Sequence, residues 1–419
     1  MKMTEGELMI SDCRALDLTD DKGFNCGKIL ADLGVDVVKV EKPGGNASRK
    51  IGPFYHDIID PEKSLHWFAH SNNTRGITLD IETSDGREIF KDLVKTADFI
   101  IESFPPRYMD NLGLGYAELS QINPGIIVVS ITPFGKDGPY ADYKASNLTC
   151  FAMAGVMHAT GYPDREPTFI SLPMAYMFGG ASGAVGAMVA FYYRGTSGEG
   201  QQVDISIQDS LASASGQGLA LAQMDKPILE RVGPFRTGLT KASKQHWIWP
   251  CADGFVCTIM RGGKLGAPTN RCLMEWLEKE GICPEFLSNY DWDNWDLGQA
   301  GDDLIEAIEE PVAELFRRHT KREIYDWAIE NRILLAPVYS PNDITEDPQL
   351  KERQFWTQVE HSELGTSITY PGSFIKSSEP LCSIRRRAPF IGEHNQEIYE
   401  GELGLCREKV LNLSQAGVI

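Results

Sequence analysis

Two histidines are the first residues whose spacing suggests chemistry. His66 and His70 lie four positions apart, which places two imidazoles on one face of a helix and can serve a zinc ion. Zinc metallopeptidases carry a glutamate directly after the first histidine, but Trp67 stands there. We therefore expect both histidines to be structural, and we expect no metal site.

The nine cysteines suggest no further centre. They are scattered, and no two form a C-x-x-C pair. The odd count and irregular spacing argue against a disulfide framework and against a cysteine zinc site. Reduced cysteines are usual in the cytosol, and the acidic segment MKMTEGELMISD lacks the apolar stretch of a signal peptide. We expect a cytoplasmic protein.

The overall charge limits the partners. A formal net charge of −19 at pH 7 repels nucleic acid and anionic membranes on average, so we expect neither as a partner. Residues 169–193 carry no charge and could be mistaken for a membrane span. Their many glycines and alanines, with Pro173 among them, favour a tightly packed buried helix that starts near Met177.

Strands and helices alternate with short connections along the first half of the chain. This alternation predicts a parallel α/β sheet of Rossmann type. Asp20-Asp21-Lys22-Gly23 stands where a G-x-G-x-x-G would follow the first strand, so dinucleotide binding is not expected. Strands are expected at 13–20, 35–41, 76–81, 98–102 and 125–131, helices at 23–34, 84–96 (capped by Ser84) and 107–122, and one more strand and helix at 203–223.

A change in composition marks a second unit. Tryptophans and acidic residues gather between 225 and 332, as in DWDNWD at 291–296. We expect a large Rossmann-like domain from 1–200 and 333–419, a linker at 201–224, and a small inserted domain at 225–332.

Nine segments, in this order and spacing, resemble family III CoA-transferases, the family of formyl-CoA and carnitine CoA-transferases. The resemblance implies a large Rossmann-like domain built from both chain ends, a smaller inserted domain, and two chains interlocked as a dimer. In the family a glycine loop of the small domain closes over the active site, and Arg261–Gly266 is either that loop or an ordinary surface loop. The segments are LDLT (16–19), LADLGVDVVKVEKPGG (30–45), NTRGITLDIETSDGREIF (73–90), ADFIIESFPP (97–106), LGLGY (112–116), INPGIIVVSITPFGKDGPYAD (122–142), GEGQQVDISIQDSL (198–211), EDPQL (346–350) and RAPFIGEH (387–394).

The family's catalytic aspartate has no counterpart in this chain. The resemblance implies a carboxylate nucleophile, because the reaction passes through an acyl anhydride with the enzyme. That aspartate belongs to a P-x-x-D stretch, and the matching stretch runs from Pro173 to Tyr176. A phenol, with a reference pKa of about 10, stays protonated at neutral pH and would give an aryl ester. We therefore expect no catalytic residue, unless Asp164 or Glu166 has replaced the nucleophile.

Five residues match the family's contacts to coenzyme A. The resemblance implies CoA binding by Lys42, Leu79, Ser103, Phe104 and Lys144, although both lysines could also be ordinary surface residues. Two neighbouring positions depart from the family, because Glu82 stands where a lysine is frequent and Asn111 where an arginine is frequent. Both changes remove positive charge and put ordinary CoA affinity in doubt.

These features together predict a non-catalytic subunit of a heteromeric CoA-transferase. We expect a homologous partner subunit that carries the catalytic aspartate, with CoA moving from an acyl-CoA such as succinyl-CoA to a carboxylic acid such as benzylsuccinate. Coenzyme A is then a substrate, and no cofactor is expected. Two alternatives stay open: a self-sufficient transferase or isomerase with a displaced nucleophile, and a CoA-binding scaffold protein.

Overall fold

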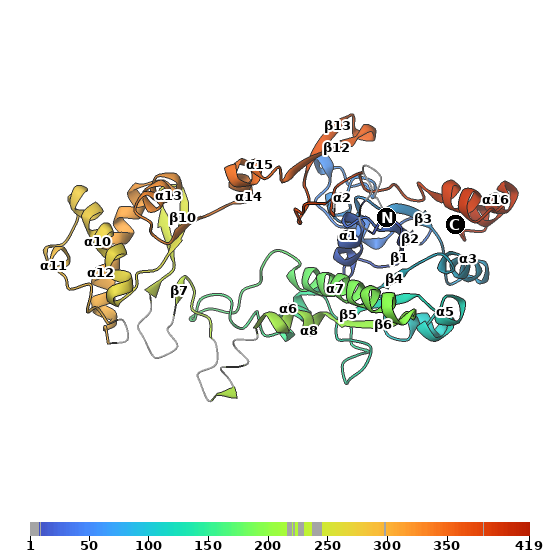
Figure 1. The fold of residues 1–419 in the computed structure, drawn as a ribbon, viewed down its shortest axis with the longest axis horizontal. Coiled ribbons are helices and arrows are strands. Elements are labelled where there is room, and N and C mark those ends of the chain that lie inside the picture. The colour runs from blue at the N-terminus through green and yellow to red at the C-terminus, as the bar shows by residue number, and fades with distance from the viewer. Residues whose placement is uncertain are drawn as a thin grey trace. The chain divides into compact units, whose positions relative to one another are not determined.

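The chain divides into two compact units in the computed structural model (Figure 1). The first unit comprises residues 1–157, 169–227 and 351–419, and the second comprises 158–168 and 228–350. These limits differ from the expected ones, because 201–224 was expected to be a linker and 333–350 to lie in the large domain. The structure describes residues 8, 10–215, 220, 223–224, 230–236, 245–296, 299–379 and 381–419.

A six-stranded parallel sheet forms the centre of the first unit, in the order β3-β2-β1-β4-β5-β6. This is the strand order of a doubly wound Rossmann sheet, and the expected α/β class with a parallel sheet is confirmed. The strands are β1 (Arg14–Asp17), β2 (Asp36–Glu41), β3 (Arg75–Thr78), β4 (Phe99–Glu102), β5 (Ile127–Thr132) and β6 (Gln202–Ser206). Residues 202–212 lie in the expected linker but supply the edge strand β6 and the helix α8 (Ile207–Ala212), in agreement with the strand and helix expected at 203–223.

Apolar side chains on both faces of the sheet explain why it is covered on both sides. Ala15 and Val37 belong to one buried cluster, and the adjacent Leu16 and Val38 belong to another, as the alternation along a strand requires. The first cluster includes residues of α1 (Phe24–Asp32), α6 (Asn147–Met153) and α7 (Met174–Ser197), and the second includes residues of α3 (Ser84–Val94), α4 (Tyr108–Asn111), α5 (Tyr116–Ile122) and α16 (Arg407–Gln415).

Helix α3 shows how local chemistry sets a boundary. The hydroxyl of Thr83 accepts a hydrogen bond from the Gly86 N–H at 3.0 Å, so Thr83 is the N-terminal cap and the expected cap Ser84 is the first helical residue. The remaining helix near the sheet, α2 (Leu65–Ser71), is capped by Ser64 in the same manner.

Helix α7 packs unusually close to its neighbours through small residues. A Cβ atom on Gly180 would lie 2.7 Å from the Asn25 Cβ and 3.0 Å from the Cys26 backbone nitrogen in α1. Only the face with the glycines and alanines is buried, whereas Val185, Val189 and others are exposed. The helix begins at Met174 rather than near Met177. By length and composition alone it could cross a membrane, with 39% of its most apolar window buried.

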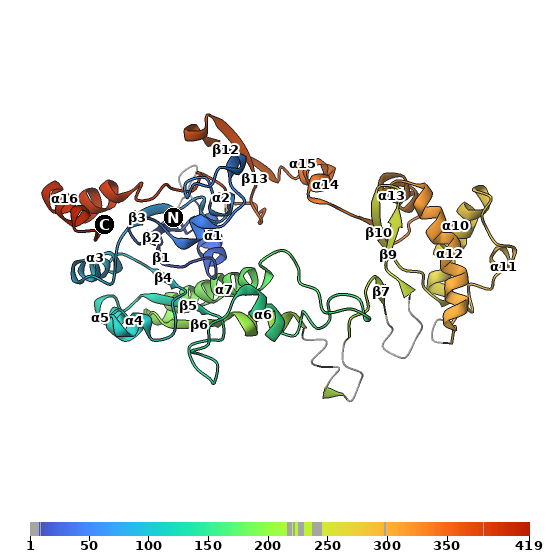
Figure 2. The same ribbon diagram turned by 180° about the vertical axis from the view of Figure 1, so that it is seen from behind.

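The C-terminal segment returns to the first strands, as Figures 1 and 2 show for the red and blue parts of the ribbon. The Tyr399 hydroxyl donates to the Thr78 carbonyl at 2.6 Å, and the Asp80 N–H donates to the Val418 carbonyl at 2.7 Å. Both chain ends therefore build the first unit. Before this return, the chain forms a hairpin of β12 (Trp356–His361) and β13 (Thr366–Pro371).

The second unit combines a small antiparallel sheet with helices. Buried Trp249, Trp292 and Trp295 belong to its core, to which large aromatic side chains contribute much buried apolar area. Gly263 begins α10, so most of the stretch 261–266 is the start of a helix and not the expected flexible loop. The elements are β9 (Ile248–Cys251), β10 (Gly254–Thr258), β11 (Leu335–Val338), α10 (Gly263–Lys279), α11 (Glu285–Ser288), α12 (Asp302–Arg318), α13 (Lys321–Glu330) and α14 (Pro341–Glu346).

Candidate active site

A cavity of about 360 Å³ lies at the carboxyl ends of four parallel strands of the first unit. In doubly wound sheets ligands bind at this edge, next to the point where the strand order reverses. Here that point falls between β1 and β4. The lining residues follow β1, β2, β3 and β4 or end them: Leu18, Asp20, Lys22, Val40, Glu41, Lys42, Gly45, Asn46, Ala47, Leu79, Ile81, Ser103, Phe104 and Pro105.

The structure brings four of the five implied CoA contacts to this one cavity. Lys42 directly follows β2, Leu79 follows β3, and Ser103 and Phe104 follow β4. Lys144 is exposed in the segment before α6, and it is not among the described residues that line the cavity. The sequence alone indicated each of these residues separately. Four of them meet because the strands that they follow are parallel and end at the same edge of the sheet.

A hydrogen-bonded group of lining residues joins the loops that follow β1 and β4. The Ser103 hydroxyl donates to Asp20 Oδ1 at 2.8 Å, and the Asp20 N–H donates to Ser103 Oγ at 3.0 Å. Lys22 forms an ion pair with the other carboxylate oxygen of Asp20. Ser103 is buried, and its hydroxyl makes both of these hydrogen bonds with Asp20. They hold the loop after β1 in place.

Glu82 lies beside the cavity, where it contacts the lining residue Lys42 and also Tyr108. Its Oε2 lies 2.8 Å from the Lys42 Nζ, and its Oε1 accepts a hydrogen bond from the Tyr108 hydroxyl at 2.6 Å. The hydrogen bond from Lys42, followed by that from Tyr108, lowers the pKa of Glu82, so this carboxylate is ionised at neutral pH. Sequence reasoning identified Glu82 as a lost positive charge but missed that it also neutralises Lys42.

Tyr176 lies in the first turn of α7, at the position expected for the nucleophile. Its side chain is 9% exposed and belongs to the apolar cluster beneath the sheet. Burial, and after it the charges of Asp21, Cys150 and Asp20, raise the pKa of Tyr176. The Tyr176 backbone N–H already donates to Asn147 Oδ1 at 3.3 Å. The phenol is therefore held protonated and is a poor nucleophile.

The two carboxylates considered as replacements are exposed loop residues. Asp164 and Glu166 are exposed and belong to the second unit, whereas Tyr176 belongs to the first. An exposed carboxylate in a loop has neither the desolvation nor the fixed partners that usually prepare a nucleophile.

His66 and His70 have the environment of structural residues. Their rings lie 4.5 Å apart, and His70 Nδ1 donates to the His66 carbonyl at 2.9 Å. Burial lowers the pKa of His66 to about 4 and also lowers the pKa of His70, so both are neutral at neutral pH. Within the described ranges, no group of three His, Cys, Asp or Glu side chains could hold a metal ion.

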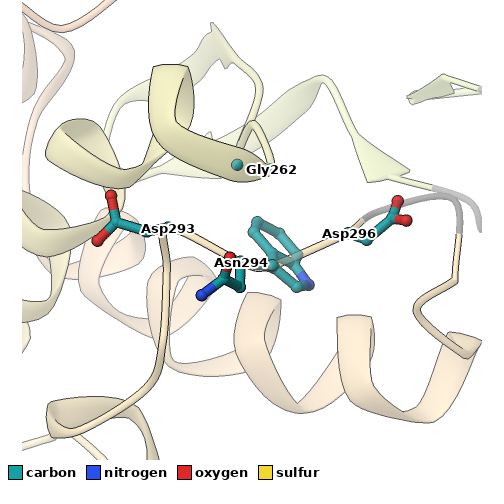
Figure 3. Close-up of a pocket in the computed structure, with 6 residues that line it drawn as sticks. Gly262, Asp293, Asn294 and Asp296 are labelled. Atoms are coloured by element: carbon teal, nitrogen blue, oxygen red, sulfur yellow. The ribbon is translucent and has the colours of Figure 1, made fainter.

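A second cavity, of about 400 Å³, lies in the second unit at the start of α10. Figure 3 shows the carboxylates of Asp293 and Asp296 at opposite ends of this site, with Asn294 between them and Gly262 opposite. Asp293 forms an ion pair with Arg271, and the Gly263 N–H donates to the Trp295 carbonyl at 2.8 Å. The charged side chains among its six lining residues are both aspartates, so this cavity suits an anionic ligand less well than the first.

Comparisons with known proteins agree over nearly the whole chain. The model of the family described as CoA-transferase family III matches residues 11–395. Subunit BbsE of succinyl-CoA:(R)-benzylsuccinate CoA-transferase from Thauera aromatica is 32% identical, with 97% of each chain covered. The beta subunit of succinyl-CoA–L-malate CoA-transferase from Chloroflexus aurantiacus is 28% identical over 94% of each chain. A crystal structure of a CAIB/BAIF family protein from Brucella suis superposes with a TM-score of 0.82 at 25% identity, covering 94% of this chain and 99% of that one.

Proposed function

Because the chain belongs to CoA-transferase family III, we propose that it is the non-catalytic subunit of a heteromeric CoA-transferase. The observation that carries this proposal is the buried phenol of Tyr176, which begins α7 where the resemblance implies an aspartate. The expectation of an inactive site was drawn from the sequence, and the burial of Tyr176 supports it.

The reaction explains why a phenol cannot substitute. A carboxylate that attacks an acyl-CoA thioester forms a mixed anhydride and releases the CoA thiolate. The thiolate can then attack the anhydride, which gives an enzyme–CoA thioester and frees the first acid. A phenol would instead give an aryl ester, whose only acyl carbonyl is that of the first acid, so the thiolate can only reverse the step. The enzyme–CoA thioester therefore cannot form at Tyr176.

The relatives indicate the kind of partner. Two of them are named as subunits, BbsE and a beta subunit, so members of this family do occur as parts of larger assemblies. We propose a homologous partner that carries the aspartate at the matching position, interlocked with this chain, in the cytoplasm. In this proposal succinyl-CoA is the donor and benzylsuccinate the acceptor, as in the reaction for which the relative from Thauera aromatica is named.

The first cavity has a role in the same proposal. Lys42, Leu79, Ser103 and Phe104 would contact coenzyme A there, and Lys144 would contact it from outside the cavity lining. Apolar walls with few polar groups are typical of small-molecule sites.

Expression with and without the partner tests the proposal. The chain is produced alone and together with the product of the neighbouring gene, and CoA transfer from succinyl-CoA to benzylsuccinate is followed by chromatography of the thioesters. We expect transfer only from the pair, and its loss when the partner's aspartate is replaced by alanine. Full activity of this chain alone would contradict the proposal and favour a self-sufficient enzyme.

A further inference from the structure

We propose that Arg49 is a positioning residue for the first cavity, which holds the loop after β2 against the loop after β1 and thereby sets the affinity of this chain for coenzyme A. The inference rests on the proposed function, because it takes coenzyme A as the ligand of this cavity. Arg49 is not among the described residues that line the cavity, and the resemblance does not imply it as a CoA contact.

The guanidinium of Arg49 is fully buried and is held by several partners. Its Nε donates to Glu41 Oε2 at 2.7 Å and its Nη2 to Glu41 Oε1 at 2.8 Å, so the two side chains form a bidentate pair. Nη1 donates to Glu62 at 2.8 Å, and Nη2 also donates to the Pro389 carbonyl at 3.0 Å. The guanidinium carbon lies 3.8 Å from the centre of the Trp67 ring. These contacts leave Arg49 one position, and its neighbours are fixed by it.

Glu41 and Asn46 connect this pair to two walls of the cavity. Glu41 ends β2, and both residues line the cavity. The Asn46 backbone N–H donates to Glu41 Oε2 at 2.7 Å, and the Asn46 side-chain amide donates to the Thr19 carbonyl at 2.9 Å. Thr19 lies between the lining residues Leu18 and Asp20 in the loop after β1. The contacts that begin at the guanidinium therefore join the two loops.

The aliphatic part of Arg49 supports the turn in the loop after β2. Gly45 lines the cavity and has a φ of 90°. A Cβ atom there would lie 3.0 Å from the Arg49 Cδ and 2.7 Å from the Ile391 Cδ1. The turn thus approaches these side chains as closely as only a glycine allows. A side chain of another shape at position 49 would leave the turn without this support.

Arg49 also compensates a negative charge in the cavity lining. Glu41 is buried, and both of its carboxylate oxygens accept hydrogen bonds from the guanidinium. Coenzyme A carries several phosphate charges, so an uncompensated carboxylate in the lining would repel it. Loss of Arg49 should therefore weaken CoA binding in two ways, by loosening the wall and by leaving the Glu41 charge without its cation.

Arg75 provides the matched control, because it is a second buried arginine in ion pairs. Its guanidinium pairs with Asp36, Glu397 and Glu402. Arg75 is the first residue of β3 and so lies at the amino end of its strand, whereas the cavity lies at the carboxyl ends. Substitution of Arg75 therefore disturbs a comparable buried network at the opposite edge of the same sheet.

Calorimetric titration of the full-length chain with coenzyme A tests the inference, with urea denaturation of each variant beside it. We expect Arg49→Lys to weaken CoA binding roughly five- to twentyfold, since a lysine keeps the charge but cannot bridge both oxygens of Glu41. Arg75→Lys should leave the affinity within about twofold, even where it lowers stability as much, because its contacts are distant from the cavity.

Two further variants separate positioning from a general loss of stability. Asn46→Ser keeps an oxygen that can cap the Ser48 N–H but removes the donor to Thr19, so it should weaken CoA binding with little change in the free energy of unfolding. Glu41→Gln, added to Arg49→Met, removes the uncompensated charge and should recover part of the affinity that Arg49→Met loses. If the Arg49 variants do not fold, Asn46→Ser decides alone.

Equal losses of CoA affinity in Arg49→Lys and Arg75→Lys would overturn the inference, because a general loss of stability would then be the cause. An unchanged affinity in both Arg49→Lys and Asn46→Ser would also overturn it, as would a wild-type chain that does not bind coenzyme A.

These outcomes are separate from the test of the proposed function, which measures transfer in the presence of a partner. A heteromer that transfers CoA, while the Arg49 and Asn46 variants of this chain bind coenzyme A normally, would overturn only the present inference. Full transfer by this chain alone, with its CoA affinity still dependent on Arg49, would overturn only the non-catalytic assignment.

Discussion

The cavity beside β1–β4 and the start of α7 have kept different parts of the family pattern. Around the cavity, four residues that the resemblance implies for CoA binding still line one space. At the start of α7 small residues pack on α1, and Tyr176 stands at the position where the resemblance implies a carboxylate. Under the proposed function, this difference means that a site loses its chemistry through one side chain while the surrounding scaffold persists.

Restoring the carboxylate gives the largest expected effect. In the variant Tyr176→Asp we expect incubation with succinyl-CoA to give a covalent adduct that hydroxylamine removes, whereas the wild type gives none. An aspartate in the first turn of a helix is stabilised as an anion by the helix dipole. Intact-protein mass spectrometry detects the adduct.

Tyr176→Phe is the matched control for that experiment, because it keeps the ring and removes the hydroxyl. It should behave like the wild type. Equal labelling of the wild type, Tyr176→Phe and Tyr176→Asp would reveal a nucleophile elsewhere, and the contrast between the two regions would then be wrong.

The buried ion pair between β1 and β2 should tolerate substitution less well than the exposed pair of Lys42 and Glu82 beside the cavity. Asp17 in β1 and Lys39 in β2 form a buried ion pair at 2.7 Å, and the Lys39 ammonium lies 3.7 Å from the centre of the Phe24 ring. Asp17→Asn leaves an uncompensated buried charge and should lower the free energy of unfolding by about 3–5 kcal/mol. Urea denaturation followed by circular dichroism measures this change.

The double variant Asp17→Asn with Lys39→Met removes both charges and should recover most of that loss. A loss below about 1 kcal/mol in Asp17→Asn alone would mean that the pair contributes little beyond the packing around it.

Substitutions that disturb the close packing of α7 should change the free energy of unfolding by a smaller amount. Gly180→Ala places a methyl group against α1 and should lower the free energy of unfolding by about 1–3 kcal/mol. Gly195, in the same helix, has no atom within 4 Å of its added Cβ, so Gly195→Ala should stabilise by up to about 1 kcal/mol. Equal effects of the two substitutions, measured by urea denaturation, would show that helix propensity and not contact with α1 dominates.

The smallest expected effect is a pH dependence near α2. The pKa of His66 falls from 6.5 to about 4 on folding, so between these pH values the unfolded chain binds more protons than the folded one. Stability from this group is therefore present above pH 6.5 and is lost as the pH falls toward 4. The partly exposed ring should contribute about 1 kcal/mol.

Substitution of His66 by Gln should flatten the difference in unfolding free energy between pH 7 and pH 4.5, relative to the wild type. The comparison of the two proteins at each pH cancels the contributions of the carboxylates that both share. An unchanged slope would show that His66 titrates alike in both states.

The sequence predicted the sheet better than the contacts at its edge. Short apolar runs between helical segments sufficed to predict the strands, because buried parallel strands read as nearly continuous apolar segments. The pair of Lys42 and Glu82 was missed although a signal existed: both residues follow strands that are neighbours in a Rossmann order. Side chains just beyond the carboxyl ends of adjacent parallel strands meet at one edge, so opposite charges there could have been matched.

The structure differs from the expectation elsewhere too, at places where one local sequence pattern is compatible with several structures. Thr83 and Ser84 can both cap a helix, and only the hydrogen bond to Gly86 decides between them. The glycines after Arg261 suggest a loop by composition, but tertiary packing lets Gly263 and Gly266 start α10. The burial of one face of α7 depended on α1, whose position no pattern within α7 encodes.

The return of the C-terminal segment to β3 has a consequence for how the protein is made. Asp80, Thr78 and the sheet beside them are completed by Tyr399 and Val418, so the first unit cannot finish folding until the last part of the chain has left the ribosome. Synthesis proceeds at roughly 5–20 residues per second. The second unit, which lies almost entirely within 228–350, is complete before residues 399–418 are made and can fold first, while the apolar faces of the early strands are still partly uncovered.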